Sequence, residues 1–157
     1  PGFLIGSQSE KAGIIRHGSK MLYAYAESTV PKITVVLRKS YAGGYLAMCS
    51  KDLGADFVFE FPCGEICLMG PQGAVNILSR KEFKRAEEAG EDVAALRAKL
   101  NQEFHDQYVN PLYSAGLQHV DDIIDPRDMR KMVHRALEVC SMKRDELPPK
   151  KHGNMPI

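Results

Sequence analysis

The sequence predicts an α/β domain, and three observations support this class. The run Ile33–Leu37 is apolar and rich in β-branched residues, which favours a strand covered on both faces. The glycine pair Gly43-Gly44 follows it and precedes the apolar segment 46–48, so the order is strand, turn and helix start. After residue 80 the strand signal ends, and apolar residues recur at the three- and four-residue steps of amphipathic helices.

The composition is typical of one globular domain. The 157 residues are 44% hydrophobic and 26% charged, which excludes a disordered or collagen-like chain. Lysine and arginine number 21 against 20 acidic residues, so no basic excess predicts a nucleic-acid partner. No apolar run reaches the ~18 residues of a membrane helix, and the N-terminus lacks the pattern of a signal peptide. We therefore expect a soluble chain without membrane contact, and the initial proline suggests an excised or processed piece.

Four cysteines and five histidines are present, and neither set predicts a metal site. Cys49, Cys63, Cys67 and Cys140 include one C-x3-C pair without a second pair or a nearby histidine, and no two histidines have the i, i+4 spacing of a helical metal site. We expect buried, reduced thiols, because free cysteine is among the most buried residue types. A reducing compartment, the cytoplasm, is the expected location.

The N-terminal part predicts one helix and one central strand. Ser7 and Glu10 have capping-box spacing, and apolar residues at helical intervals predict a helix over 8–28. Pro31 prevents its continuation. The strand over 33–37 is predicted to be central and buried because both of its faces are apolar.

Two further strands and a helix follow. The segment 57–61 predicts a strand that Pro62 ends, and 66–69 predicts a third, short strand. The turn 70–73 then leads into a helix through 74–78.

The remaining sequence is predicted to be helical. A stripe from Phe83 to Phe104 predicts two helices separated by Gly90, with the apolar face used as core or as a helix-packing seam. Asp125 at the N-cap and Pro126 at the first helical position begin a last helix, which ends before the proline pair 148–149. Met129, Val133, Ala136, Leu137 and Cys140 are its expected buried stripe, and an extended tail over 150–157 follows.

The glycine pair is the most informative candidate for chemistry. Free N–H groups at a helix start can hold an anion or a developing oxyanion, and glycine allows a ligand close to the backbone; a tight turn without a ligand is the alternative. Tyr41 and Tyr45 flank the pair and can line a cavity, or serve as core aromatics. The turn Met69–Ala74 offers similar donors.

Other catalytic patterns are absent from the sequence. Neither glycine turn fits the dinucleotide or P-loop motifs, and no G-x-S-x-G elbow occurs. Acidic residues such as Glu60 and Glu65 have no second carboxylate at a spacing that indicates a catalytic acid–base pair. A side-chain nucleophile and an acid–base pair are therefore not predicted.

Several segments, in order along the chain, carry a resemblance to an enzyme family. They are Gly2–Leu4, Gly13–Ala24, Val30–Val35, Arg38–Tyr45, Gly54–Asp56, Met69–Val75, Ile123–Arg127 and Lys151–Asn154. With these segments the sequence resembles the biotin-dependent acyl-CoA carboxyltransferases, and within them the C-terminal half of the propionyl-CoA carboxylase β-subunit. The resemblance implies a crotonase-like fold, a spiral of ββα units with outer helices, and makes residues 1–157 a C-terminal carboxyltransferase domain from a longer subunit.

The resemblance also implies a reaction and a set of partners. Carboxyl transfer between carboxybiotin and an acyl-CoA such as propionyl-CoA or acetyl-CoA is expected, with carboxybiotin on a separate carrier protein supplying both the carboxyl group and the base. Expected partners are the N-terminal carboxyltransferase half, the biotin carboxyl carrier protein, biotin carboxylase and further copies in a hexamer. The chain alone is expected to be inactive. Alternatives are a biotin-dependent decarboxylase acting on glutaconyl-CoA or methylmalonyl-CoA, and a non-catalytic assembly module.

Site residues follow from the same resemblance. Gly43 and Gly44 are the implied catalytic residues, whose N–H groups form an oxyanion hole for the biotin ureido oxygen. Tyr41, Ala42, Gly43, Gly44 and Tyr45 are the implied cofactor-binding residues, and Leu46, Gly70 and Gly73 the implied substrate-binding residues. On this reading, a valine at Gly44 should reduce turnover far more than it disturbs folding.

The chain departs from the family pattern at several positions near this site. Ala42 stands where glycine is usual, and Leu46 stands where the propionyl-CoA enzymes usually have aspartate. Phe61-Pro62 replaces Trp-Pro, and Cys63-Gly64 replaces Thr-Ala. These differences leave the acyl specificity open.

Overall fold

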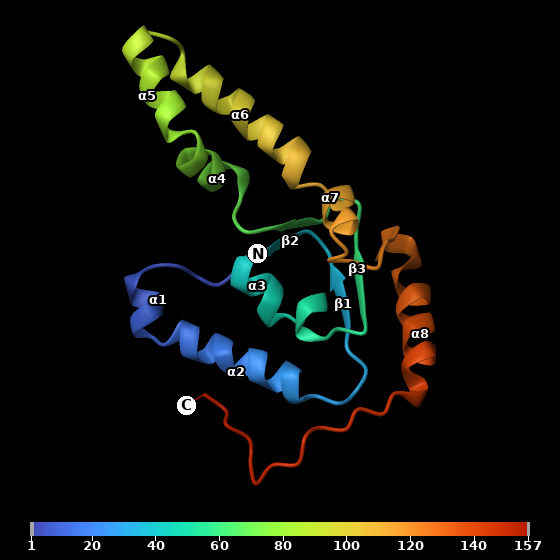
Figure 1. Ribbon diagram of the computed structural model, residues 1–157. Coiled ribbons are helices and arrows are strands. Elements are labelled where there is room, and N and C mark those ends of the chain that lie inside the picture. The colour runs from blue at the N-terminus through green and yellow to red at the C-terminus, as the bar shows by residue number, and fades with distance from the viewer. Residues whose placement is uncertain (1, 157) are drawn as a thin grey trace.

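The computed structural model describes residues 2–156, and its strands confirm the α/β class (Figure 1). A three-stranded sheet has the order β1-β3-β5, and a two-stranded sheet pairs β2 with β4. Every one of these pairings is parallel. The strands are β1 (Ile33–Val36), β2 (Lys39–Tyr41), β3 (Phe57–Glu60), β4 (Glu65–Cys67) and β5 (Asp122–Ile123).

Helices cover both faces of the larger sheet and form a separate arm (Figure 1). In Figure 1, α2 and α3 lie on one side of β1 and β3, α8 lies on the other side, and α4, α5 and α6 project outward. No helix within residues 2–156 combines the length and apolarity needed to cross a membrane. The helices are α1 (Ser7–Lys11), α2 (Ile14–Glu27), α3 (Ala42–Ala47), α4 (Pro71–Leu78), α5 (Arg80–Ala89), α6 (Val93–Tyr108), α7 (Pro111–Gly116) and α8 (Met129–Val139).

Alternating side chains on β3 build two cores. Phe59 packs with Ile124 and Ala136, so this face of the sheet meets α8. Val58 packs with Val36 and other small apolar side chains on the opposite face. Because successive side chains of a strand point to opposite faces, both sides of the sheet are apolar, as expected for parallel strands.

The prediction that the strand over 33–37 is central is wrong for the described residues. β3 is central, and β1 lies at the edge of the sheet. An open groove of about 790 Å³ runs along β1 and is lined mainly by residues 30–40. Leu37, predicted to be in the strand, lies beyond its end and is 58% exposed.

The predicted N-terminal helix is two helices. Gly13 adopts a left-handed φ of 85° and is the N-cap of α2, which separates α1 from α2. The capping role predicted for Ser7 is also wrong, because Ser7 is the first residue of α1 and Gly6 is its N-cap without a side-chain bond.

Local signals at other helix ends are confirmed. Gly90 ends α5 with a left-handed φ of 71°, and Pro71 begins α4. The carboxylate of Asp125 accepts a bond of 2.8 Å from the Arg127 N–H, which caps the 3-10 turn leading into α8. α8 ends at Val139 and is followed by a 3-10 turn to Met142, so the helix ends before the proline pair 148–149, as predicted.

Two predicted sets of buried side chains are only partly confirmed. Within the predicted α8 stripe, Ala136 and Cys140 are buried and Val133 is partly buried, but Leu137 is 49% exposed and Met129 is 37% exposed. All four cysteines are free thiols, and Cys49 is buried, whereas Cys63 is exposed in the turn after β3. The prediction of buried thiols is thus wrong for Cys63, because the turn Pro62-Cys63 between β3 and β4 is exposed, and Cys67 is only partly buried.

The C-terminal segment packs back across the N-terminal helices (Figure 1). Lys143 forms an ion pair of 2.9 Å with Asp56, and the same carboxylate accepts a bond of 2.7 Å from the Lys32 N–H. Lys150 pairs with Glu27 at the end of α2. The segment is extended as predicted up to residue 156, and Ile157 lies outside the described residues.

We predict that Asp56→Asn lowers the free energy of unfolding by about 1–3 kcal/mol at neutral pH, because a part-buried carboxylate with charged and backbone donors is lost. Burial opposes ionisation of Asp56, but the bonds from Lys32 and Lys143 prevail and lower its pKa below the ordinary 3.8. A lowered pKa gives stability that is present above the unfolded-state value and lost as pH falls through the folded-state value. Urea unfolding between pH 7 and pH 3 measures this.

Asp52→Asn is the matched control, since Asp52 is exposed in the adjacent 3-10 turn. A loss of equal size in both variants, or a loss at Asp56 that does not shrink in acid, contradicts the prediction.

Candidate functional site

The turn between β2 and α3 places the predicted glycines at a helix start. Tyr41 is the N-cap of α3 and makes no side-chain capping bond. The first N–H groups of an α-helix have no acceptor within the helix. Gly43 and Gly44, the second and third residues of α3, therefore carry backbone donors that the helix itself does not use.

The left-handed backbone of this turn is at Ala42, and the glycines serve a different purpose. Ala42 has a φ of 49°, whereas neither Gly43 nor Gly44 has a positive φ. A Cβ on Gly44 would lie 2.7 Å from the Cα of Gly2, and one on Gly43 would lie 3.3 Å from the ring of Phe3. The glycines thus admit the N-terminal segment against α3. Valine at Gly44 would therefore displace this segment, so it is expected to disturb folding as well as turnover.

A cavity of about 640 Å³, here named the turn cavity, opens beside α3. Ala42, Gly43, Tyr45 and Leu46 form its wall on the turn side. Its other walls come from β4, the arm, α7 and the segment after α7. These lining residues are Ile66, Cys67, Leu68, Leu78, Phe104, Tyr108, Tyr113, Ser114, Leu117 and His119.

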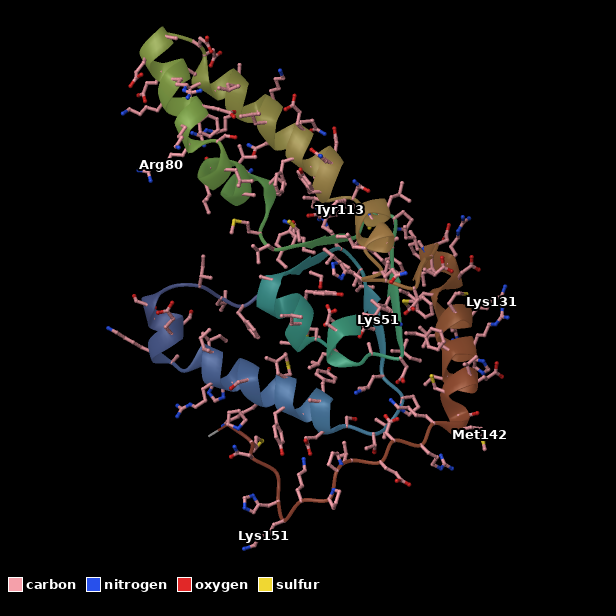
Figure 2. All side chains as sticks on the ribbon, viewed as in Figure 1. Lys51, Arg80, Tyr113, Lys131, Met142 and Lys151 are labelled. Carbon is pink, nitrogen blue, oxygen red and sulfur yellow. The ribbon has the colours of Figure 1, made fainter. Side chains whose placement is uncertain are left out.

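Aromatic rings form one continuous wall of the turn cavity. Phe104 and Tyr108 have ring centroids 5.0 Å apart, and Tyr108 meets Tyr113 edge-on at 5.5 Å. Tyr113, labelled in Figure 2, lies where the arm joins the core. Such a wall suits a flat or apolar group, because aromatic side chains provide large apolar contact area.

Tyr45 connects the turn to the opposite wall. Its hydroxyl donates to the His119 carbonyl at 3.3 Å, and the two rings meet edge-on with centroids 5.9 Å apart. Burial, more than the nearby acidic groups, raises the pKa of Tyr45 to about 12. Tyr45 is thus a neutral structural donor, and the cavity lining contains no carboxylate and no lysine.

A second, more polar cavity of about 530 Å³, here named the loop cavity, is lined by residues of β2 and of the segment 70–73. Tyr41, Gly70 and Gly73 line it together with Arg38, Lys39 and Glu65. The Tyr41 hydroxyl donates to the Glu65 carboxylate, whose other oxygen lies 3.8 Å from Arg38 Nε. Burial and this bond raise the pKa of Tyr41 well above its ordinary value.

The structure therefore divides the predicted site residues. Ala42, Gly43, Tyr45 and Leu46 lie together in the turn cavity, as the sequence led us to expect. The loop cavity holds Tyr41, Gly70 and Gly73, and Gly44 lines neither cavity.

Sequence reasoning missed most of the turn cavity's walls. Phe104 belongs to the stripe that we predicted as core or packing seam, and it is only partly buried. Tyr113 and Ser114 lie on α7, which the sequence did not predict, and Asn110 caps this helix by accepting from the Tyr113 N–H at 3.0 Å. The Asn110-Pro111 pair is the signal that could have located α7.

Comparison with known proteins identifies the family and the fold of the chain. The model of the carboxyl transferase domain family matches residues 1–155. The chain is 54% identical over 156 residues to the methylmalonyl-CoA carboxyltransferase 12S subunit of Propionibacterium freudenreichii subsp. shermanii. It is 52% identical over 157 residues to the propionyl-CoA carboxylase beta chain of Saccharopolyspora erythraea, and 49% identical over 157 residues to methylmalonyl-CoA decarboxylase subunit alpha of Propionigenium modestum.

The matches cover almost the whole chain but a minor part of each relative. They span 99% or 100% of this chain and 29% or 30% of the relatives' length. A solved structure of transcarboxylase 12S, described as a hexamer with methylmalonyl-CoA and methylmalonic acid bound, superposes with a TM-score of 0.92 at 54% identity over 100% of this chain and 29% of that chain. This agreement confirms the crotonase-like fold that the resemblance implied.

We predict that Ala42→Gly raises the free energy of unfolding by about 1 kcal/mol, because an alanine at left-handed φ carries a steric cost that glycine does not. Chemical denaturation measures the change. Ala94→Gly on the exposed face of α6 is the control, and it should lower stability by roughly 0.5–1 kcal/mol. A loss in both variants contradicts the prediction.

Proposed function

Because the chain belongs to the carboxyl transferase domain family, we propose that it forms the biotin-side part of an acyl-CoA carboxyltransferase. In this proposal residues 1–157 belong to the C-terminal carboxyltransferase domain of a longer subunit. The observation that carries it is the turn cavity, which joins the free amide donors at the start of α3 to apolar walls.

The turn cavity has the dimensions and chemistry to receive biotin. Its volume of about 640 Å³ is within the usual range of small-molecule sites, and its walls are apolar with a few polar atoms. Biotin, presented by a separate carrier protein, supplies the carboxyl group and the base when bound. Ala42, Gly43 and Tyr45 are the residues that would hold it.

The backbone at α3 supplies electrostatic stabilisation in this proposal. The N–H group of Gly43, which lines the turn cavity, donates to an oxygen that gains negative charge during carboxyl transfer. The N–H group of Gly44 is assigned as the second donor from the family resemblance. The positive end of the helix backbone adds to this effect. The apolar lining lowers the local dielectric, which strengthens each of these interactions.

The acyl-CoA is assigned to the two cavities around the turn. Leu46, 43% exposed beside the amide donors, borders the acyl group. Gly70 and Gly73 lie in the loop cavity, so we assign them to the polar part of the thioester. Lys39 and Arg38 line the same cavity and carry charge opposite to that of phosphates.

The proposal includes partners that this chain does not contain. These are the N-terminal half of the carboxyltransferase, the biotin carboxyl carrier protein and biotin carboxylase, with assembly into a hexamer in the cytoplasm. The hexamer described for transcarboxylase 12S, whose structure matches this chain, supports the assembly. The free state of all four cysteines fits a reducing compartment.

Decarboxylation is the second candidate. The 49% identity to methylmalonyl-CoA decarboxylase subunit alpha favours it as the alternative direction of the same half-reaction. The two candidates use the same cavity and differ in their partners.

We predict that the isolated 157-residue chain has no acyl-CoA carboxylation activity, because substrate positioning by the remaining part of the subunit is missing. The assay is carboxylation of propionyl-CoA with biotinylated carrier, biotin carboxylase, ATP and bicarbonate. The complete subunit with the same partners is the positive control. Robust turnover by the isolated chain contradicts the proposed division of labour, and an inactive complete enzyme contradicts the proposed function.

We predict that Leu46→Asp in the complete enzyme changes kcat/KM among acetyl-, propionyl- and longer acyl-CoA substrates by roughly 10- to 200-fold. A carboxylate in an apolar wall disfavours longer apolar acyl groups. Leu137→Asp is the control, because Leu137 is 49% exposed on α8 and lines neither cavity. Unchanged ratios in a folded, assembled Leu46→Asp enzyme contradict the assignment of the acyl site.

A further inference from the structure

A fully buried carboxyl group lies behind the turn cavity. Glu60, the last residue of β3, is 0% exposed. Its Oε2 lies 2.5 Å from the Ser114 hydroxyl on α7, and its Oε1 has no hydrogen-bond partner among the described residues. Ser114 itself lines the turn cavity, so the contact connects the sheet to the cavity wall.

The surroundings of Glu60 contain no compensating charge. Its neighbours in register, Val36 on β1 and Ile123 on β5, are apolar. From α3 the ionisable group that interacts with it is the Tyr45 phenol, and from α7 the group is the Ser114 hydroxyl, which is not charged. Within residues 2–156, Glu60 forms no ion pair with any lysine, arginine or histidine.

Hydrogen counting at Ser114 distinguishes the two states of the carboxyl group. Ser114 has one hydroxyl hydrogen but faces two oxygens, Glu60 Oε2 at 2.5 Å and the Pro111 carbonyl at 2.9 Å. A protonated Glu60 donates to Ser114, and Ser114 then donates to Pro111. An ionised Glu60 leaves one of these oxygens without a donor and buries an unpaired charge, which is costly.

We propose that Glu60 is a positioning residue, held as a neutral acid, whose proton links β3 through Ser114 to the first turn of α7 and thereby fixes the Tyr113–Leu117 wall of the turn cavity. That the cavity binds a ligand rests on the proposed function. That Glu60 holds a proton rests on the contacts described above. Burial raises the pKa of Glu60, and the bond from Ser114 opposes this in part.

Gly64 provides the space that this arrangement needs. A Cβ at Gly64 would overlap Cγ and Oε1 of Glu60. Glu60 and Gly64 are therefore complementary in volume, and alanine at position 64 should be tolerated only when Glu60 is shortened.

Hydrogen exchange of the α7 amides in the assembled full-length enzyme tests whether Glu60 is protonated. A raised folded-state pKa gives stability that is present below the unfolded-state value and lost as pH rises through the folded-state value. The ordinary pKa of a glutamate side chain is 4.5. Above about pH 4.5 the α7 amides of the wild type should therefore exchange faster relative to those of Glu60→Gln, by up to tenfold per pH unit, until the folded-state pKa is reached. Glu87→Gln, an exposed change on α5, should follow the wild type.

Two further variants test the positioning role. Glu60→Ala should speed α7 exchange by about tenfold or more near pH 4.5, where Glu60→Gln should not, because only the amide preserves a donor to Ser114. Gly64→Ala should destabilise the wild type but not the Glu60→Ala background. With propionyl-CoA as the probe, Glu60→Ala should lower kcat/KM and Glu60→Gln should retain it.

Each experiment has an outcome that overturns the inference. A wild-type to Glu60→Gln exchange ratio that is constant with pH shows that Glu60 holds no proton. Equal protection of α7 in Glu60→Ala and the wild type shows that Glu60 does not position the wall. An enzyme that fails to carboxylate or decarboxylate any acyl-CoA refutes the proposed function, while the exchange measurements still decide the inference about Glu60.

Discussion

The parallel pairing of β3 with β1 and β5 is the interaction on which the rest of the structure depends. Its register sets Val36 opposite Glu60 and places the end of β1 beside the end of β3. The chain leaves β1 at this level, pairs β2 with β4 and enters α3. The amide donors of α3 and the walls from α7 therefore meet at one end of the sheet, where ligands usually bind in α/β proteins.

Elements with local signals could be predicted from the sequence, and elements that depend on distant partners could not. Gly90, Pro71 and Asp125 act on their own backbone, so the α5–α6 break, the start of α4 and the cap before α8 were predictable. β2 and β5 are short and exist through pairing with strands elsewhere in the chain. The edge position of β1 likewise depends on strand order, which hydrophobic pattern does not encode.

The candidate site shows the same division. The sequence predicted that Gly43, Tyr45 and Leu46 share one site, because they are neighbours in one turn. The sequence could not predict that Tyr41 lies in the loop cavity, because its place there depends on a bond to Glu65 on another strand. It also could not distinguish Phe104 as a cavity wall from a packing seam, because both uses give the same helical period.

A neutral Glu60 is consistent with the electrostatics that the turn cavity requires. The proposed reaction develops negative charge beside the amides of Gly43 and Gly44, in surroundings without a carboxylate or lysine among the lining residues. An ionised Glu60 behind Ser114 would repel that charge through a low-dielectric wall, where Coulomb interactions are strong. As a neutral acid, the same side chain contributes its hydrogen bond and its volume to the wall without that repulsion. Burial without a cationic partner therefore keeps the site suited to an anion, while the Glu60 proton donates to Ser114 and the Ser114 hydroxyl donates to the Pro111 carbonyl of α7.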